Sequence, residues 1–253
     1  MNKYISVKNI SCCYGKKEVL SDISMDIDKG KILFLMGNNG SGKTTLLKCL
    51  LNNIPIQKGS ILFDGKLVSD ISKSDFSKMI SYVPQNINLN CDLKVKDYLV
   101  LGRNPYIAFG SPTSSDYEIV EKYALQTGVL EILTQPFNSL SGGQKQWVTI
   151  TRALIQEAPV LVMDEPMSAL DLEKQAELLI LLKRLKDEFG KTIILTSHNP
   201  NHCFCVDSIV CLLNHKHVLA FGNPKQVFTQ EHIYDVYGPH ILLRTDNLIE
   251  FSL

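Results

Sequence analysis

The chain has 253 residues, enough to bury a sizeable core in one large domain or two small ones. Its 26 Lys and Arg residues equal its 26 Asp and Glu residues, so charge gives no reason to expect nucleic acid as the main partner. No apolar run approaches the roughly 20 residues that span a bilayer. The first residues lack the apolar core of a secretory signal, so we expect the chain to remain where it is made.

Two segments near the N-terminus have the pattern of half-buried strands. Residues 5–10 alternate apolar and polar side chains, and residues 61–63 precede the turn pair Asp64 and Gly65. Such segments predict an antiparallel sheet at the edge of the fold.

Other short segments are continuously apolar, which predicts strands covered on both faces, as in a parallel sheet wrapped by helices. They are residues 32–36, 160–163, 193–195 and 209–213. Helices are expected at residues 45–51 and 172–189, the second with Gly190 as its stop signal.

The stretch from about residue 90 to 156 differs from the rest of the chain. It contains helix-like segments at residues 95–101, 115–127 and 146–155, and no convincing buried strand. We interpret it as a helical insertion into an α/β core.

Residues 37–44 match the phosphate-loop pattern G-x-x-x-x-G-K-S/T. Glycines allow a tight turn whose N–H groups point at phosphates, and the following helix adds its positive N-terminus. Lys43 would supply charge to the β- and γ-phosphates, and the Thr44 hydroxyl would ligate magnesium. A mere glycine-rich turn is the alternative, disfavoured because an apolar strand precedes it and a helix follows. The predicted nucleotide-binding residues of the loop are Gly37, Asn38, Asn39, Gly40, Ser41, Gly42, Lys43, Thr44 and Thr45.

Asp164 and Glu165 follow the apolar strand at residues 160–163. A carboxylate at Asp164 can hold magnesium, and Glu165 can orient an attacking water or take its proton. Adjacent carboxylates at a strand end can also be only a turn, but an upstream phosphate loop favours the catalytic interpretation.

Leu140-Ser141-Gly142-Gly143-Gln144 resembles the signature motif of ABC (ATP-binding-cassette) ATPases. The resemblance implies an α/β fold: a P-loop NTPase (RecA-like) parallel-sheet core with an antiparallel β subdomain and a helical insertion. It implies an ABC ATPase domain over residues 3–235, with its helical subdomain at about 90–156, and a short C-terminal extension at 236–253.

The same resemblance assigns roles to residues outside the phosphate loop. Ser141, Gly142, Gly143 and Gln144 would bind the γ-phosphate of a nucleotide held by a second copy of the chain. Four further roles are implied: adenine stacking for Tyr14, magnesium binding and sensing of the transport subunit for Gln85, linkage of the two sites for Asp171, and γ-phosphate contact for His198. A metal site of His198 with His202 is the alternative, disfavoured because no Glu in an H-E-x-x-H frame accompanies them.

Residues 101–106, Leu-Gly-Arg-Asn-Pro-Tyr, resemble a segment of ATPases from importers of iron chelates, haem, cobalamin or molybdate. The implied function is an ATP-hydrolysing importer subunit that uses ATP and Mg²⁺. Its partners would be a second copy, a transmembrane permease docked near Gln85 and residues 90–106, and a substrate-binding protein, at the cytoplasmic face of the membrane. Alternatives are an exporter subunit, an importer for another solute, a soluble ABC protein of DNA repair, translation or cluster assembly, and a non-hydrolysing scaffold.

Two further features have smaller consequences. Met167 stands where the family usually has Thr, which we expect to affect packing beside Glu165. The seven cysteines lack paired C-x-x-C spacing and are expected to be reduced thiols, partly buried, as with Cys49 and Cys211.

Overall fold

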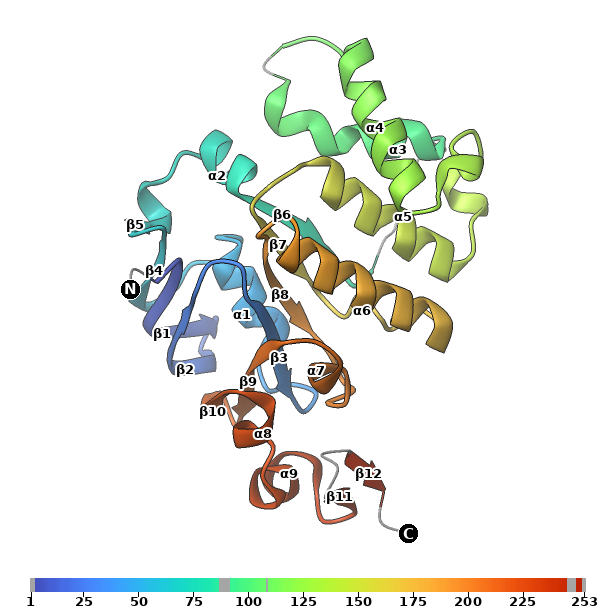
Figure 1. Cartoon of the computed structure of the whole chain (residues 1–253). Helices are drawn as coiled ribbons and strands as arrows, with labels where there is room; N and C mark the ends of the chain where they lie inside the picture. The colour runs from blue at the N-terminus through green and yellow to red at the C-terminus, as the bar shows by residue number, and fades with distance from the viewer. Residues whose placement is uncertain (1–2, 87–91, 108, 245–248, 252–253) are drawn as a thin grey trace. The chain divides into compact units, whose positions relative to one another are not determined.

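The computed structural model describes residues 3–86, 92–107, 109–244 and 249–251 (Figure 1). The chain forms two compact units. The first unit comprises Met1–Ile71 and Leu178–Leu253, and the second comprises Ser72–Glu177. The start of the predicted docking segment, at residues 90 and 91, lies outside the described residues.

An antiparallel sheet of the first unit carries the predicted half-buried strands. Ile5 and Val7 are buried and Ser6 and Lys8 are less so, as the alternation in the sequence predicts. The alternation then breaks at Asn9, whose φ is 49°, and a register shift between Val7 and Ile10 turns Ile10 to the buried side. Asp64 and Gly65 turn the chain with φ values of 48° and 77°. The strand order is β2-β1-β4-β5, with β1 at Ile5–Tyr14, β2 at Lys17–Ile27, β4 at Lys58–Phe63 and β5 at Lys66–Leu67.

A second group of strands in the first unit is parallel and buried. Strand β3 (Ile32–Gly37) is buried along its length and pairs in parallel with β8 (Thr192–Thr196) and β9 (Ser208–Asn214). Strand β10 (His217–Gly222) pairs antiparallel with β9. Helix α1 (Lys43–Leu50) follows the phosphate loop, as the sequence predicts, and begins two residues before its predicted start. The remaining elements are η1 (Val68–Asp70), α7 (His202–Cys205), α8 (Pro224–Val227), α9 (Gln230–Tyr237), β11 (Ile241–Leu243) and β12 (Ile249–Phe251).

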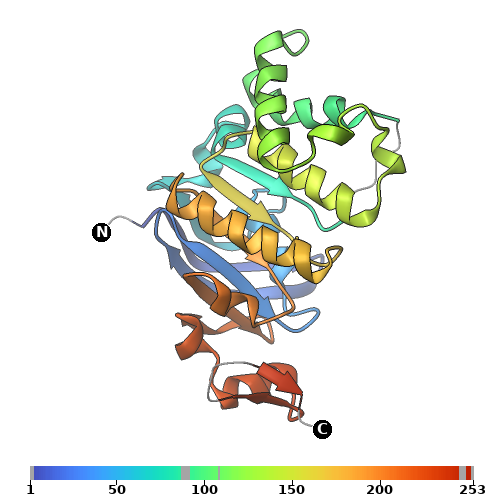
Figure 2. The ribbon, with the colours of Figure 1, turned by 45° about the vertical axis from the view of Figure 1, so that its right-hand side comes forward.

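The second unit combines two parallel strands with a helical bundle (Figure 2). Strand β6 (Ile80–Val83) pairs in parallel with β7 (Val160–Met163), whose bounds match the predicted apolar run. Helices α3, α4 and α5 share a core in which the rings of Tyr98 and Phe137 lie 4.5 Å apart. The helices are α2 (Lys73–Met79), α3 (Val95–Val100), η2 (Leu101–Tyr106), α4 (Ser114–Gln126), η3 (Leu130–Ile132), η4 (Phe137–Ser139) and α5 (Gly142–Ile155).

Helix α6 (Leu172–Asp187) ends two residues before its predicted end, and the chain leaves it through Gly190 at a φ of 61°. Among the described residues, no helix combines the length and the apolar composition that a bilayer crossing requires.

Candidate functional site

The phosphate loop connects β3 to α1 in the first unit. Gly37 has a φ of 139°, and a Cβ at this position would collide with the carbonyl oxygen of Leu213. Lys43 is only 6% exposed, and its ammonium group donates hydrogen bonds to the carbonyl oxygens of Gly37 (2.7 Å) and Asn38 (3.0 Å). The charge of Lys43 is thus held across the loop by the loop's own backbone.

Two features of the loop fit a bound phosphate. The buried hydroxyl of Ser41 has no hydrogen-bond partner within the part of the chain that the structure describes, which is costly unless a ligand supplies one. Helix α1 begins after Gly42, at a φ of 105°, with no side-chain cap on its first N–H groups. Thr44 and Thr45 follow in the first turn, Thr44 half-buried and Thr45 buried. The loop therefore offers a positive helix end and an unpartnered donor in one place.

The other predicted residues of the first unit lie at strand ends. Leu35 of β3 is level with Thr196 of β8, so the carboxyl ends of these parallel strands share one edge of the sheet. The phosphate loop follows β3 and the exposed His198 follows β8, and both therefore leave that edge. Tyr14 ends β1 with 48% of its surface exposed, which leaves its ring accessible for stacking.

The predicted carboxylates lie in the second unit, at the end of β7. Asp164 is 2% exposed, and its backbone N–H donates to the carbonyl oxygen of Val83 (2.9 Å). Glu165 has a φ of 48°, a left-handed conformation that strains a residue with a long side chain. Burial, and then the charge of Asp164, raise the pKa of Tyr82 to about 12.

Gln85 and Glu165 are in direct contact, although 80 positions separate them. The Gln85 amide donates a hydrogen bond of 2.6 Å to a carboxylate oxygen of Glu165. The structure therefore brings the predicted sensing residue and the predicted general base together, a contact that the sequence did not predict.

The predicted signature residues form the N-terminus of α5. The Ser141 hydroxyl accepts from the Gln144 N–H (3.3 Å), and the Gln144 side chain accepts from the Ser141 N–H (3.0 Å). This is a capping box, whose S-x-x-Q pattern was present in the sequence but was not used. Ser141, Gly142 and Gln144 are exposed, in contrast to Ser41, Gly42 and Lys43.

The signature glycine also contacts the predicted coupling segment. A Cβ at Gly143 would lie 3.3 Å from the carbonyl oxygen of Ala169, so a larger residue would have to displace that segment. Asp171, two residues later, accepts from the Lys174 N–H (2.8 Å) and so caps α6. Met167 in the same segment is buried, and its carbonyl oxygen accepts from the Gln175 side chain (3.3 Å).

Arg103, which is itself buried, anchors an ionic cluster that sequence reasoning missed. Its guanidinium group lies 3.2 Å from the carboxylate of Asp116 and 3.0 Å from that of Glu157, and donates to the carbonyl oxygen of Ile155 (3.1 Å). Hydrogen bonds from Thr113, and then the contact with Arg103, lower the pKa of Asp116. The Arg in the importer-like segment therefore fixes η2 against α4 and the end of α5.

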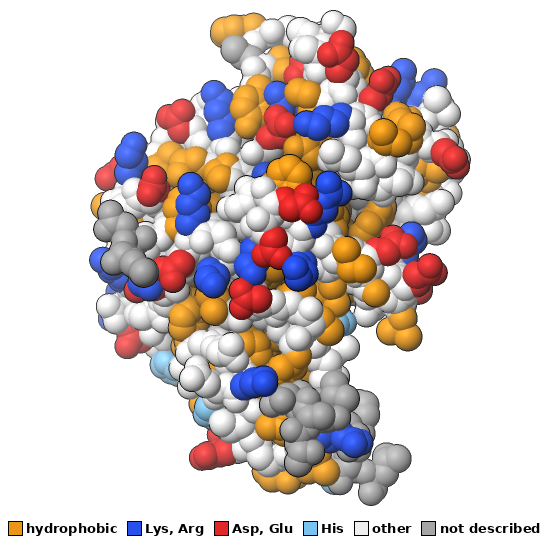
Figure 3. Space-filling view, viewed as in Figure 1, with side chains coloured by type: hydrophobic (Ala, Val, Ile, Leu, Met, Phe, Trp, Pro, Cys, Tyr) orange, Lys and Arg blue, Asp and Glu red, His pale blue; other side chains and the backbone are white. Residues whose placement is uncertain are grey.

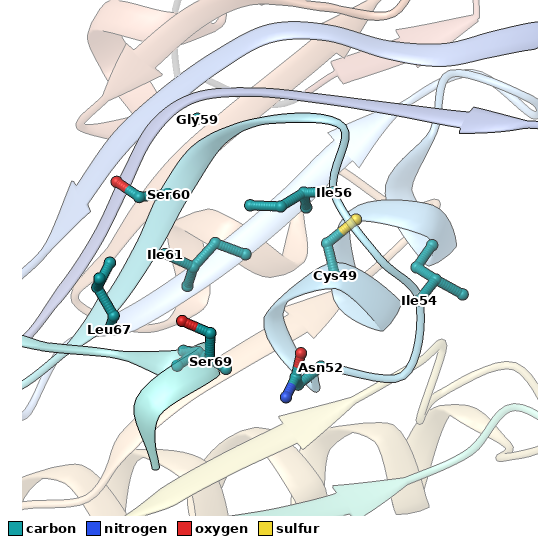
Figure 4. Close-up of a pocket in the computed structure, with 10 residues that line it drawn as sticks. Cys49, Asn52, Ile54, Ile56, Gly59, Ser60, Ile61, Leu67 and Ser69 are labelled. Atoms are coloured by element: carbon teal, nitrogen blue, oxygen red, sulfur yellow. The ribbon is translucent and has the colours of Figure 1, made fainter.

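A cavity of about 290 Å³ lies elsewhere in the first unit (Figure 4). Apolar side chains line it, among them Ile54, Ile56 and Ile61, together with Cys49 of α1. None of the predicted site residues lines it, so we assign it no part in nucleotide binding. On the face shown in Figure 3, basic and acidic side chains are interspersed, as the balanced charge of the chain suggests.

Comparison with known proteins decides the family. A protein-family model described as ABC transporter matches residues 20–168, more than half of the chain. The chain belongs to the ABC transporter family. The resemblance found from the signature motif is therefore confirmed.

Individual ABC proteins match over nearly the whole chain. The iron(3+)-hydroxamate import ATP-binding protein FhuC of Bacillus subtilis is 33% identical over 243 residues, which cover 96% of this chain and 90% of the relative. A solved metal-chelate type ABC transporter, in an inward-facing conformation, has 30% identity and a TM-score of 0.83, covering 99% of this chain and 97% of its own. A dimeric bacterial ABC transporter cassette has 25% identity and a TM-score of 0.79, covering 87% and 98%.

These similarities confirm the predicted fold class, a P-loop NTPase core with an antiparallel subdomain and a helical insertion. The ABC ATPase therefore binds and hydrolyses ATP, and belongs with the ATP-binding subunits of importers. The roles of individual residues in that reaction stay predictions.

Proposed function

We propose that this ABC ATPase drives uptake of an iron chelate, or of a related metal complex, through a membrane permease. The observation that carries the proposal is the 33% identity to the iron(3+)-hydroxamate import protein over 96% of the chain. The similarity to a solved metal-chelate type transporter supports the same solute class. Haem, cobalamin, an oxyanion such as molybdate, or a different solute is the alternative that an uptake assay separates.

The phosphate loop is proposed to bind the phosphates of ATP, with Lys43 on the β- and γ-phosphates and Tyr14 against the adenine. Lys43 would exchange its two backbone carbonyl partners for phosphate oxygens, and the buried Ser41 hydroxyl would gain the partner that it lacks. Lys43 would gain anionic acceptors in place of neutral ones, and Ser41 would gain an acceptor where it has none. Both changes favour binding of ATP.

Thr44, Gln85 and Asp164 are proposed to hold Mg²⁺ with the nucleotide. Hydroxyl, amide and carboxylate oxygens are the donors that this hard cation prefers, so the donor set fits. Bound Mg²⁺ would neutralise part of the phosphate charge. Glu165 is proposed to take a proton from the attacking water, and His198 to contact the γ-phosphate. Gln85 would have to release Glu165 for that role, since the two side chains are hydrogen-bonded.

A second copy of the chain is proposed to complete each ATP site. Ser141 and Gly142 are exposed on the capped end of α5, so they can reach a ligand held by another molecule. The similar bacterial cassette is a dimer, which supports the same assembly here. In a two-fold pair, each signature would act on the nucleotide of the partner, and Asp171 would link the two sites.

The other proposed partners are the proteins that an importer needs besides its ATPase. We propose a permease that docks near Gln85 and the segment up to Tyr106, which places the pair at the cytoplasmic face of the membrane, and a separate substrate-binding protein. The domain limits of 3–235, with a helical subdomain at about 90–156 and an extension at 236–253, remain part of this proposal.

Uptake of radiolabelled iron in a deletion strain tests the proposal. The strain should lose uptake of a ferric hydroxamate, regain it with the wild-type chain, and not regain it with Glu165→Gln produced at equal level. Manganese, cobalamin and molybdate uptake are measured in parallel. Normal ferric uptake in the deletion strain, with loss of one of the other solutes, would overturn the iron-chelate assignment but leave the ATPase assignment intact.

A further inference from the structure

The ring of His202 is held by the two residues on either side of His198. His202 opens helix α7, four positions after His198 (Figure 1). Its Nδ1 lies 3.1 Å from the Ser197 hydroxyl, and its Nε2 lies 3.3 Å from the side-chain nitrogen of Asn199. One buried ring, 9% exposed, therefore connects both flanks of the predicted γ-phosphate contact.

The surrounding hydrogen bonds fix which ring nitrogen carries the proton. The side-chain oxygen of Asn199 accepts from the Asn201 N–H (3.0 Å), so the Asn199 amide nitrogen faces the ring and donates to Nε2 of His202. The proton of the neutral ring then lies on Nδ1, which donates to the Ser197 hydroxyl. That hydroxyl also accepts from the Asn199 N–H (3.2 Å). Each of these hydrogen bonds then joins one donor to one acceptor when His202 is neutral.

The backbone supports the same conformation. The His202 N–H donates to the carbonyl oxygen of Asn199 (3.3 Å), and the Cys203 N–H donates to that of Pro200 (3.1 Å). These turns bring His202 back over the loop from Ser197 to Asn199. The loop that leaves β8 therefore folds back on itself, with His198 and Asn199 exposed.

We propose that His202 is a positioning residue that holds the loop carrying His198 in the conformation that reaches the γ-phosphate of ATP. The inference rests on the proposed role of His198. His202 itself touches neither ATP nor water in this account, and it acts through the two residues that it binds. Its effect should therefore appear in turnover rather than in binding of ATP.

The surroundings of His202 favour its neutral state. A second proton on His202 would place an N–H group against the Asn199 amide nitrogen, and burial lowers the pKa of His202. Burial also raises the pKa of Cys203 on the same helix and of Tyr237, which faces Cys203. It raises the pKa of Cys211, on the neighbouring strand β9, to about 12. These neighbours stay uncharged, while Asp207 just beyond the helix is paired with Lys186 (2.6 Å).

Sequence reasoning considered His202 only as a second metal ligand. Both of its ring nitrogens face protein groups, and the described residues contain no cluster of three or more His, Cys, Asp or Glu side chains that could hold a metal. The positioning role uses the same two nitrogens without requiring an ion.

The test is a double-mutant cycle on the purified full-length chain, measured as steady-state ATP hydrolysis. His202→Leu removes both ring contacts and His202→Gln retains a polar side chain. The matched control is His232→Leu, because His232 is another partly buried histidine, bound through Nδ1 to the Val227 carbonyl oxygen (2.7 Å). Thermal melting checks that each variant is folded. Loss of two neutral hydrogen bonds predicts a decrease in kcat of about tenfold for His202→Leu, with little change in KM.

Non-additive losses of kcat distinguish a positioning role of His202 from a general effect on stability. If His202 acts through His198, the variant with both His198→Ala and His202→Leu should be no slower than His198→Ala alone. His202→Gln should recover part of the activity. The ratio of wild-type to His202→Gln activity should shrink as pH falls, because protonation breaks the network only in the wild type.

Three results would overturn the inference: additive losses in the double variant, equal losses in His232→Leu, or an activity ratio that does not change with pH. A different result identifies failure of the underlying proposal. If His198→Ala hydrolyses ATP at the wild-type rate, then His198 has no catalytic role, whatever His202 does.

Discussion

Helices α1 and α5 both begin at glycine-containing motifs, but their N-termini are built differently. Helix α1 starts after Gly42 with no side-chain cap, whereas Ser141 and Gln144 close the start of α5 in a capping box. The first end is buried and includes Ser41, whose hydroxyl lacks a partner among the described residues. The second is exposed and locally satisfied.

This difference between the two helix ends suggests that they have different roles. An uncapped, buried helix end gains most from a ligand of its own, because bound phosphate supplies the missing acceptors. A capped, exposed end is stable without a ligand, and it remains accessible to a nucleotide that another molecule binds. The phosphate loop should therefore govern affinity for ATP, and the signature should govern turnover in the assembled pair.

The largest expected effect comes from Glu165→Gln. Replacing the proposed general base with a neutral isostere should lower kcat by about 10²- to 10⁴-fold and leave ATP binding intact. Steady-state hydrolysis and equilibrium binding of a fluorescent ATP analogue measure the two quantities. Turnover close to wild type in this variant would remove Glu165 from the mechanism.

Lys43→Ala and Ser141→Ala directly test whether the phosphate loop governs affinity and the signature governs turnover. Loss of charge-assisted hydrogen bonds from Lys43 should weaken ATP binding by the isolated chain by about ten- to a hundredfold. Ser141→Ala should leave that binding unchanged but slow hydrolysis. Isothermal titration at protein concentrations that keep the chain monomeric provides the affinities. Equal weakening of ATP binding by the two substitutions would contradict the separate roles proposed for the phosphate loop and the signature.

The smallest effect is expected at Gln144. Gln144→Ala removes half of the capping box, which should cost about 1 kcal/mol of stability at the start of α5 and reduce hydrolysis a few fold. Gln144→Glu serves as the control, because a carboxylate can accept the same bond from the Ser141 N–H. If the negative charge of that control slows hydrolysis far more than Gln144→Ala does, the signature binds an anion at this position.

The sequence predicted elements best where one signal dominated. The run at residues 160–163 became β7 because continuous burial requires continuous apolar side chains. Strand β6 was missed because Ser81 and Tyr82 interrupt its apolar pattern, although Ser81 is buried and its hydroxyl donates to the Val160 carbonyl oxygen (3.3 Å). Strand β10 was missed because the turn before it uses His215 and Lys216, at φ values of 45° and 74°, in place of glycine or asparagine.

Contacts within the candidate site were harder to predict than its residues. Motif spacing indicated Gln85 and Glu165 separately, but their hydrogen bond depends on the pairing of β6 with β7. The cluster around Arg103 likewise joins segments about 50 positions apart. The Ser141–Gln144 capping box is the exception, because its signal is local and was already present in the sequence.

Mixing two inactive variants tests the central claim, that the signature of one chain acts on ATP held by another. Glu165→Gln retains ATP binding and an intact signature, and Ser141→Ala retains Lys43 and Glu165. If the signature acts on the partner's nucleotide, random pairing gives mixed dimers in half of the population, each with one complete site. Hydrolysis should then rise to about a quarter of the wild-type rate, provided that the two sites work independently. A mixture no more active than the average of the two variants alone would contradict the claim.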